Sequence, residues 1–210
     1  MSKINVADFD GVIRTGYLII DLYSFCCLKQ PSLLRYSLNP GVGIARHFFD
    51  YNYLERSRIN YFRFYSKMTD KKYLIDFMDN HFDKKITNYY KDNIPKDTYV
   101  VSFNPNPLMQ LVGEYLGNDP DKYIGSNITI DEETGKLKYP LCYGKNKLNY
   151  LLKKFSDLKE IENFYTDTPW VDKKIIAISK NAYYVKGDKM QIPIKLDGKV
   201  LDEPVIFSKR

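Results

Sequence analysis

The chain has 210 residues, of which 44% are hydrophobic and 28% charged, and this composition excludes a chain that is disordered by default. No apolar run reaches the ~18 residues that a membrane-spanning helix needs, which argues against a transmembrane protein. The net charge of +6 tolerates an anionic partner without specifying one.

The N-terminal segment and the cysteines predict an intracellular setting. Residues 1–13 lack the uninterrupted apolar stretch and the small-residue cleavage site of a secretory signal. Cys26, Cys27 and Cys142 form an odd, sparse set without the spacing of a zinc site. We therefore expect a cytoplasmic protein whose thiols are reduced and structural.

Four short apolar segments are typical of buried parallel strands: 4–7, 99–102, 161–166 and 174–179. Helical patterns lie between the later ones. The first covers 104–116 with Asn104 as its N-cap, and the second begins near Lys145 with Leu148, Leu151, Leu152 and Phe155 on one face. Strands that alternate with helices predict an α/β fold with a doubly wound parallel sheet. In such a sheet the ligand site lies beyond the carboxyl ends of the strands.

Two segments interrupt this alternation. Residues 14–97 are far longer than the dozen or so residues that a crossover needs, and they hold 17 of the 32 aromatic residues. Because helical patterns recur in them, over 17–28, 53–65, 71–82 and 86–90, we predict an inserted helical subdomain. The second segment, 123–141, is predicted to be a β-hairpin that turns around Glu132-Glu133-Thr134-Gly135.

Residues capable of chemistry stand at the predicted strand ends and helix starts. In chain order they are Asp8, Asp10, Ser102, Lys147, Asp167 and Asp172. Two acids crowded at a buried strand end are costly unless a cation or a proton lies between them. A hydroxyl next to the free N–H groups of a helix start makes an anion site. An Asp-x-Asp-Gly turn alone equally suits an exposed loop, so the prediction depends on the whole set.

The set resembles the four motifs of the haloacid dehalogenase (HAD) superfamily of phosphohydrolases. Asp8-Phe9-Asp10-Gly11 resembles the first motif and Val100-Val101-Ser102 the second. Gly144-Lys145-Asn146-Lys147 resembles the third, with Lys147 preferred to Lys145 as the functional lysine, and Thr166-Asp167-Thr168-Pro169-Trp170-Val171-Asp172 resembles the fourth. The continuation Ser102-Phe103-Asn104-Pro105 and the segment from Tyr123 are similar to the phosphoserine-phosphatase-like branch, subfamily IB. Val12 and Thr166 depart from the usual residues, but neither removes a group needed for chemistry.

The resemblance implies an Mg²⁺-dependent phosphomonoester hydrolase that acts through an aspartyl-phosphate. Asp8 is implied as the nucleophile and Asp10 as the general acid and base. Asp8, the Asp10 carbonyl and Asp167 are implied to hold Mg²⁺. Ser102 and Lys147 are implied to bind phosphate, with Asp172 in support. It also implies that residues 1–13 and 98–210 form the core and that 14–97 form a helical cap of C1 type.

Alternatives remain within the superfamily and outside it. An acid at position 10 favours an alkoxide leaving group over halide, which disfavours a dehalogenase, and the DKTGT form of ion-pumping ATPases is absent. An inactive binding or scaffold module of the same fold and a phosphotransferase or mutase stay open. Nucleic-acid binding is disfavoured because no recognition motif accompanies the basic and aromatic residues.

The predicted cap carries most of the excess charge. Residues 14–97 contain 14 basic and 9 acidic side chains and six of the seven arginines. Arginine suits bidentate capture of carboxylate or phosphate, so the hypothesis is a small phosphorylated metabolite whose second anionic group contacts Arg56 and Arg58. The alternative is that these arginines are solvated helix faces and that the aromatic residues form the cap's core.

Overall fold

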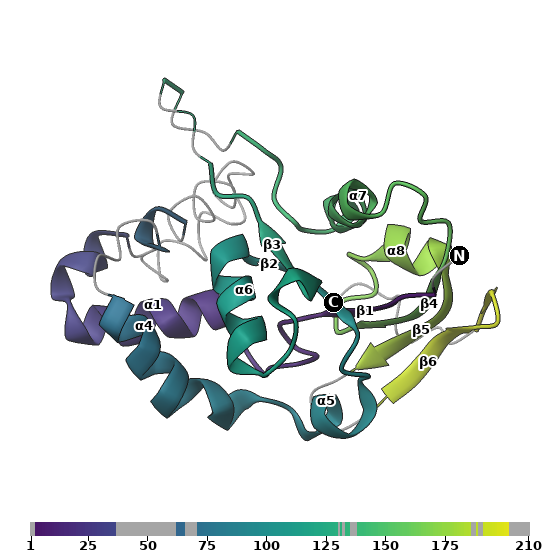
Figure 1. Ribbon diagram of the computed structural model, residues 1–210, viewed down its shortest axis with the longest axis horizontal. Helices are drawn as coiled ribbons and strands as arrows, with labels where there is room; N and C mark the ends of the chain where they lie inside the picture. The colour runs from purple at the N-terminus through teal and green to yellow at the C-terminus, as the bar shows by residue number, and fades with distance from the viewer. Residues whose placement is uncertain are drawn as a thin grey trace. The chain divides into compact units, whose positions relative to one another are not determined.

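The computed structural model describes residues 3–36, 62–65, 71–129, 131, 133–134, 138–185, 188 and 191–201. A seven-stranded sheet in the order β3-β2-β1-β4-β5-β6-β7 organises these residues (Figure 1). Its strands are β1 (Asn5–Asp8), β2 (Tyr99–Pro105), β3 (Tyr123–Ser126), β4 (Ile161–Thr166), β5 (Ser179–Val185), β6 (Gln191–Leu196) and β7 (Lys199–Val200). The first five strands are parallel, and β6 and β7 add antiparallel. This arrangement confirms the predicted doubly wound α/β sheet.

The helices are α1 (Leu18–Lys29), α4 (Lys71–Phe77), α5 (Asn88–Asn93), α6 (Asn106–Tyr115), α7 (Lys145–Lys154) and α8 (Lys173–Ile178). A π-helical turn (Met78–Phe82) and 3₁₀ turns (Pro31–Tyr36, Asp83–Lys85 and Pro120–Lys122) complete the described helical structure. Among these described helices, none has both the length and the apolar composition that crossing a bilayer requires.

The direction of the strand order reverses beside β1. The chain runs outward from β1 through β2 to β3 and then returns to the other side of β1 with β4. Because crossovers are right-handed, this reversal places α6 on one face of the sheet and α7 and α8 on the other. Figure 1 shows α7 and α8 next to each other. The carboxyl ends of β1 and β4 therefore flank the point at which such sheets bind ligands.

The core lies between the sheet and the α7 and α8 helices. Alternate residues of the inner strands, among them Val6, Val101 and Phe164, are buried against Leu151 of α7 and Ile175 of α8. Burial of these apolar side chains is the main favourable term that holds the sheet and the helices together. It also fixes the register that brings Ala7 opposite both Val100 and Tyr165.

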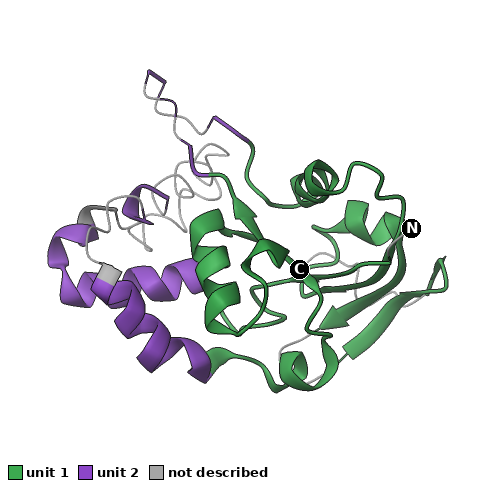
Figure 2. Cartoon of the chain, viewed as in Figure 1, with its two compact units in different colours: residues 1–17, 85–127, 140–210 green, residues 18–84, 128–139 purple. Residues whose placement is uncertain are grey.

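The chain divides into two compact units, coloured separately in Figure 2. The sheet unit comprises 1–17, 85–127 and 140–210, and the second unit comprises 18–84 and 128–139. Within the second unit, α1 buries Leu18, Leu22 and Cys26, and Tyr23 packs edge-on against Phe64 with ring centroids 4.9 Å apart. All three cysteines of the chain are buried and free of disulfides, as predicted.

Two stretches of the sheet unit that flank residues 18–84 in sequence are paired with each other. The Thr15 N–H donates to the Lys85 carbonyl at 2.8 Å, and the Thr87 N–H donates to the Ile13 carbonyl at 2.9 Å. The Thr87 hydroxyl adds a bond to the Val12 carbonyl at 2.7 Å. The chain therefore leaves the sheet unit and returns to it through adjacent, hydrogen-bonded segments.

Two of the sequence predictions for the sheet unit were wrong in detail. Residues 174–179, predicted as a strand, belong instead to the helix α8 and to the first residue of β5. Parallel β4 and β5 need a crossover between them, and this requirement overrides the strand propensity of the isoleucines. Residue 104, predicted as a helix cap, lies in β2, and α6 begins two residues later without a side-chain cap.

The segment predicted as a hairpin begins differently. Residues 123–126 form β3, a parallel edge strand of the main sheet rather than one arm of a hairpin. Beyond it, the Lys138 N–H donates to the Thr129 carbonyl at 2.9 Å, while part of the predicted turn lies outside the described residues. The parallel pairing depends on Gly125, because a Cβ there would lie 2.5 Å from the Asn104 carbonyl oxygen.

We expect Gly125→Ala to lower the free energy of unfolding by about 3 kcal/mol, because the added methyl meets backbone atoms that cannot rotate away. Gly117→Ala is the control: that glycine has a φ of +68° and open space around it, so only backbone strain of about 1 kcal/mol applies. Urea unfolding of the two variants measures the difference. Equal losses would show that the close approach at Gly125 is unimportant.

Candidate active site

The first strand delivers two carboxylates to the sheet edge. Asp8 is the last residue of β1 and is buried, and its Oδ1 accepts the Phe9 N–H at 2.8 Å. Asp10 follows in a tight turn in which the Gly11 N–H donates to the Arg14 carbonyl at 2.7 Å. Gly11 has a φ of +84°, and a Cβ there would lie 2.1 Å from Asp167 Oδ2. A glycine at this position therefore lets the acid after β4 approach the turn after β1.

A buried lysine joins two of the acids. Lys147 Nζ lies 2.6 Å from Asp8 Oδ2 and 3.1 Å from Asp172 Oδ2, and its side chain is 3% exposed. Burial alone would lower the pKa of Lys147, but the charges of the two carboxylates raise it overall. Lys145 in the same first turn of α7 is exposed. Of the two candidate lysines, the structure brings Lys147 to the acids.

Asp172 is held by a hydroxyl as well as by the lysine. The Thr166 hydroxyl donates to Asp172 Oδ2 at 2.8 Å and accepts the Thr168 N–H at 3.0 Å. Burial raises the pKa of Asp172 to about 6, although the Lys147 charge opposes the rise. Thr166, noted in the sequence only as a departure from the motif, thus orients the carboxylate that in turn contacts the lysine.

Ser102 and Asp10 are linked by a residue that sequence analysis assigned to a different role. Asn104 Nδ2 donates to Asp10 Oδ2 and to Ser102 Oγ, each at 2.9 Å. The Asn104 N–H also donates to Ser102 Oγ, at 3.2 Å. Ser102 and Asn104 are both buried. In the sequence, this contact could have been inferred only from the two polar residues Ser102 and Asn104 at the end of an otherwise apolar strand.

Asp167 adds a carboxylate to an already acidic cluster. Burial, followed by the charge of Asp8, raises the pKa of Asp167 to about 7, while Lys147 acts in the opposite direction. Asp10 also raises this pKa. All six predicted site residues therefore lie at the carboxyl edge of the sheet, and this set has four carboxyl groups and one ammonium group.

The donor chemistry of this cluster suits a hard cation. Among the described residues, no three His, Cys, Asp or Glu side chains form a group that could hold a metal ion. The ligand set implied by the sequence, however, combines the carboxylates of Asp8 and Asp167 with the backbone carbonyl of Asp10. Oxygen donors of this kind fit Mg²⁺ rather than a softer metal.

Aromatic side chains that the sequence analysis did not assign to the site lie beside it. Tyr17 is largely exposed, and after its partial burial the charges of Asp167 and Asp10 raise its pKa. Tyr143 contributes to the same rise and packs edge-on against Phe103, with ring centroids 6.4 Å apart. Arg56 and Arg58, the candidate substrate contacts, lie outside the described residues.

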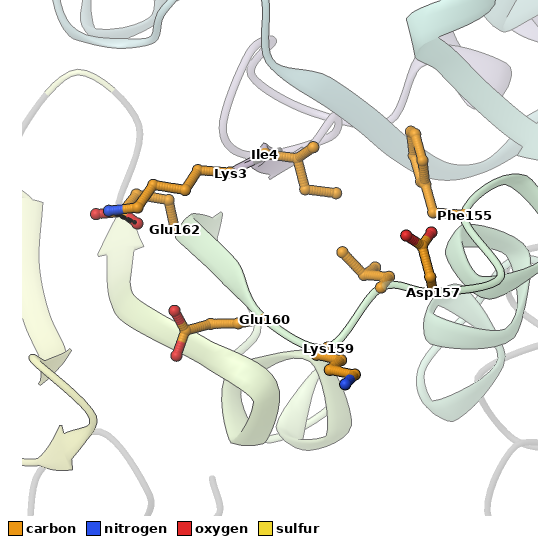
Figure 3. Close-up of a pocket in the computed structure, with 8 residues that line it drawn as sticks. Lys3, Ile4, Phe155, Asp157, Lys159, Glu160 and Glu162 are labelled. Atoms are coloured by element: carbon orange, nitrogen blue, oxygen red, sulfur yellow. Dashed lines mark ion pairs between the residues drawn. The ribbon is translucent and has the colours of Figure 1, made fainter. Parts of the chain in front are cut away.

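A separate pocket of about 260 Å³ lies at the opposite, amino-terminal end of β1 and β4 (Figure 3). Its lining mixes basic, acidic and apolar side chains: Lys3, Ile4, Phe155, Asp157, Leu158, Lys159, Glu160 and Glu162. Lys3 and Glu162 form an ion pair at 3.0 Å. None of the predicted site residues lines this pocket.

No protein-family model and no curated protein matches the sequence. Among solved structures, the chain is similar to a phosphoserine phosphohydrolase-like protein from Francisella tularensis subsp. tularensis SCHU S4. The sequence identity is 14%, the TM-score is 0.47, and the match covers 86% of each chain. A likeness at this level leaves the activity to be argued from the side chains.

We expect Lys147→Met to lower the free energy of unfolding by about 3–5 kcal/mol, because it leaves two buried carboxylates without their cation. The matched control is Lys145→Met, an exposed substitution in the same helical turn, with an expected change within about 0.5 kcal/mol. Urea unfolding at pH 8 measures both. A small loss in Lys147→Met would mean that the ion pairs do not hold the site together.

Stability in EDTA is expected to fall as the pH rises from about 4 to about 7. Over this range folded Asp167, with its pKa of about 7, keeps a proton that the unfolded chain, with a value near 3.8, has lost. Asp172, with a pKa of about 6, acts in the same direction. Asp167→Asn should therefore be more stable than wild type at pH 8 and equal to it at pH 4. Thermal unfolding across the range checks this, with exposed Asp157→Asn as control; an unchanged slope in Asp167→Asn would contradict it.

Proposed function

We propose that the protein is a phosphomonoester hydrolase of the HAD superfamily, of the phosphoserine-phosphatase-like branch, that requires Mg²⁺. The observation that carries this proposal is the buried ammonium of Lys147 between Asp8 and Asp172, at the edge that Asp10, Ser102 and Asp167 share. Hydrolysis of a phosphate monoester needs an aligned nucleophile and cancelling positive charge, because the nucleophile has to approach an anion. Asp8 would supply the nucleophile, and Lys147 together with bound Mg²⁺ would supply the positive charge.

Asp8 is the proposed nucleophile. One of its carboxylate oxygens attacks phosphorus, the bond from phosphorus to the leaving oxygen breaks, and an aspartyl-phosphate forms. Asp10 gives a proton to the leaving oxygen and then takes one from the water that attacks the aspartyl-phosphate. The second step releases inorganic phosphate and regenerates both carboxyl groups in their starting states.

The remaining groups hold the transferring phosphoryl oxygens. Lys147 Nζ lies at the nucleophile itself, and so it offers positive charge where the phosphate arrives. The Ser102 hydroxyl is a second proposed phosphate contact. Asp8, the Asp10 carbonyl and Asp167 are the residues that would hold Mg²⁺, which when bound supplies charge neutralisation at the phosphate.

The segment 14–97 is proposed to act as a cap of C1 type on a core formed by 1–13 and 98–210. A lid that excludes water adds substrate contacts that a site on strand ends lacks. The excess of arginine in this segment supports a small phosphorylated metabolite with a second anionic group as the substrate. Arg56 and Arg58 remain the proposed contacts, and the cytoplasm remains the proposed compartment.

Wild-type protein is expected to hydrolyse p-nitrophenyl phosphate with Mg²⁺ and to lose this activity in EDTA. Asp8→Asn should lower kcat by about 10³-fold or more, because an amide is a poor nucleophile toward phosphorus. Asp157→Asn, an exposed residue at the other end of the strands, should keep wild-type kcat. Phosphate release is the measurement. Wild-type protein that is inert toward p-nitrophenyl phosphate and a panel of amino-acid, sugar and nucleotide phosphates would overturn the proposal.

A further inference from the structure

We propose that Asn104 is a positioning residue that sets the direction of the Ser102 hydroxyl and the orientation of the Asp10 carboxyl group at once. The inference rests on the proposed function, because it requires that Asp10 protonates the leaving oxygen of a phosphate ester. Asn104 is completely buried in β2, and its side-chain amide joins Ser102 to Asp10 by hydrogen bonds.

The effect on Ser102 follows from counting hydrogen bonds. A hydroxyl oxygen has two lone pairs and one hydrogen. Ser102 Oγ accepts the Asn104 side-chain amide at 2.9 Å and the Asn104 backbone N–H at 3.2 Å, so both lone pairs are engaged. The hydroxyl therefore has no lone pair left to accept a further hydrogen bond, and its hydrogen remains available for donation. Asn104 makes Ser102 an obligatory donor, which is the polarity that a phosphoryl oxygen requires.

The effect on Asp10 concerns which oxygen carries the proton. Asp10 Oδ2 accepts the Asn104 amide at 2.9 Å. An oxygen that accepts such a bond is a poorer place for a proton than the other oxygen of the same carboxyl group, so the bond directs the proton to Oδ1. As Asp8 bonds to phosphorus and the ester P–O bond breaks, this proton passes from Oδ1 to the leaving oxygen, and Asp10 is left ionised with Oδ2 still held by the amide.

The orientation of the amide is itself determined by its neighbours. If the side chain were rotated by half a turn, Asn104 Oδ1 would face Asp10, and in the ionised state that Asp10 reaches after proton transfer two acceptors would meet without a hydrogen between them. The observed orientation leaves Oδ1 buried without a hydrogen-bond partner among the described residues. Burying an unpaired oxygen has a free-energy cost. The two hydrogen bonds that the amide donates to Asp10 and Ser102 offset part of it.

The test compares two esters that differ in how much protonation their leaving groups need. Phenyl phosphate leaves as a more basic oxyanion than p-nitrophenyl phosphate, so it depends more on a positioned acid. We expect Asn104→Ala to lower kcat on phenyl phosphate by about 10-fold or more beyond its loss on p-nitrophenyl phosphate. Asn104→Asp, which keeps the shape but turns the donor into an acceptor, should show the same selective loss or a larger one.

Asn118→Ala is the matched control. Asn118 Nδ2 also donates to two oxygens, the hydroxyls of Tyr90 at 2.7 Å and Tyr123 at 2.8 Å, in a place unconnected with the acids. It should lose stability without changing the ratio of the two kcat values. Thermal unfolding of each variant establishes whether it is folded at the assay temperature. If Asn104→Ala is unfolded there, Asn104→Asp is used for the comparison.

The outcomes separate the inference from the function on which it rests. Selective loss on phenyl phosphate in the Asn104 variants, with an unchanged ratio in Asn118→Ala, supports the positioning role. If the wild type cleaves both esters and the Asn104 variants lose equal factors on each, the proposed function stands and the inference alone is overturned. If the wild type cleaves neither these esters nor any of the amino-acid, sugar and nucleotide phosphates of the panel, the proposed function fails and the inference fails with it.

Discussion

The ion pair of Lys147 with Asp8 and Asp172 is the interaction on which the site depends. Four carboxyl groups gather at one edge of a buried sheet, and in the absence of a nearby cation their mutual repulsion and their loss of hydration would oppose folding. One ammonium group, 2.6 Å and 3.1 Å from two of them, offsets part of that cost. Burial and, after it, the charge of Asp8 raise the pKa of Asp167 despite the opposing charge of Lys147. This excess of carboxyl groups over cations is the feature that the proposed Mg²⁺ would offset.

The sheet brings together site residues that lie far apart in the sequence. Asp8 and Asp167 stand more than 150 residues apart in the chain, yet β1 and β4 are paired in parallel, so their carboxyl ends coincide. Gly11 then lets the turn after β1 come within contact of Asp167. A packed core below this edge holds the strands in register. The side chains at the strand and helix ends are therefore held in place and lose little conformational freedom when a ligand binds.

The sequence predicted the parts of the molecule that depend on local pattern. The strand 161–166 was predicted with the bounds that it has, because Ile161, Phe164 and Tyr165 favour a strand and the polar turn residues from Asp167 end it. The six candidate site residues were chosen because strand ends and a family resemblance both pointed to them, and their roles stay predictions. The six-residue helix α8 was missed because fewer than two turns leave no periodicity to detect. Asn104 was misassigned because an asparagine before a helix suits a cap, and only the fold brings Asp10 near enough to compete for its amide.

The paired segments at 12–15 and 85–87 have a consequence for how this protein could diversify. Because the outgoing and returning chain are already hydrogen-bonded to each other, the ends of whatever lies between them are fixed at the spacing of two adjacent strands. Any polypeptide whose own termini lie that close together could be grafted there without disturbing the sheet. An exchange of that whole module would leave the strand ends that carry Asp8 and Asp167 in place.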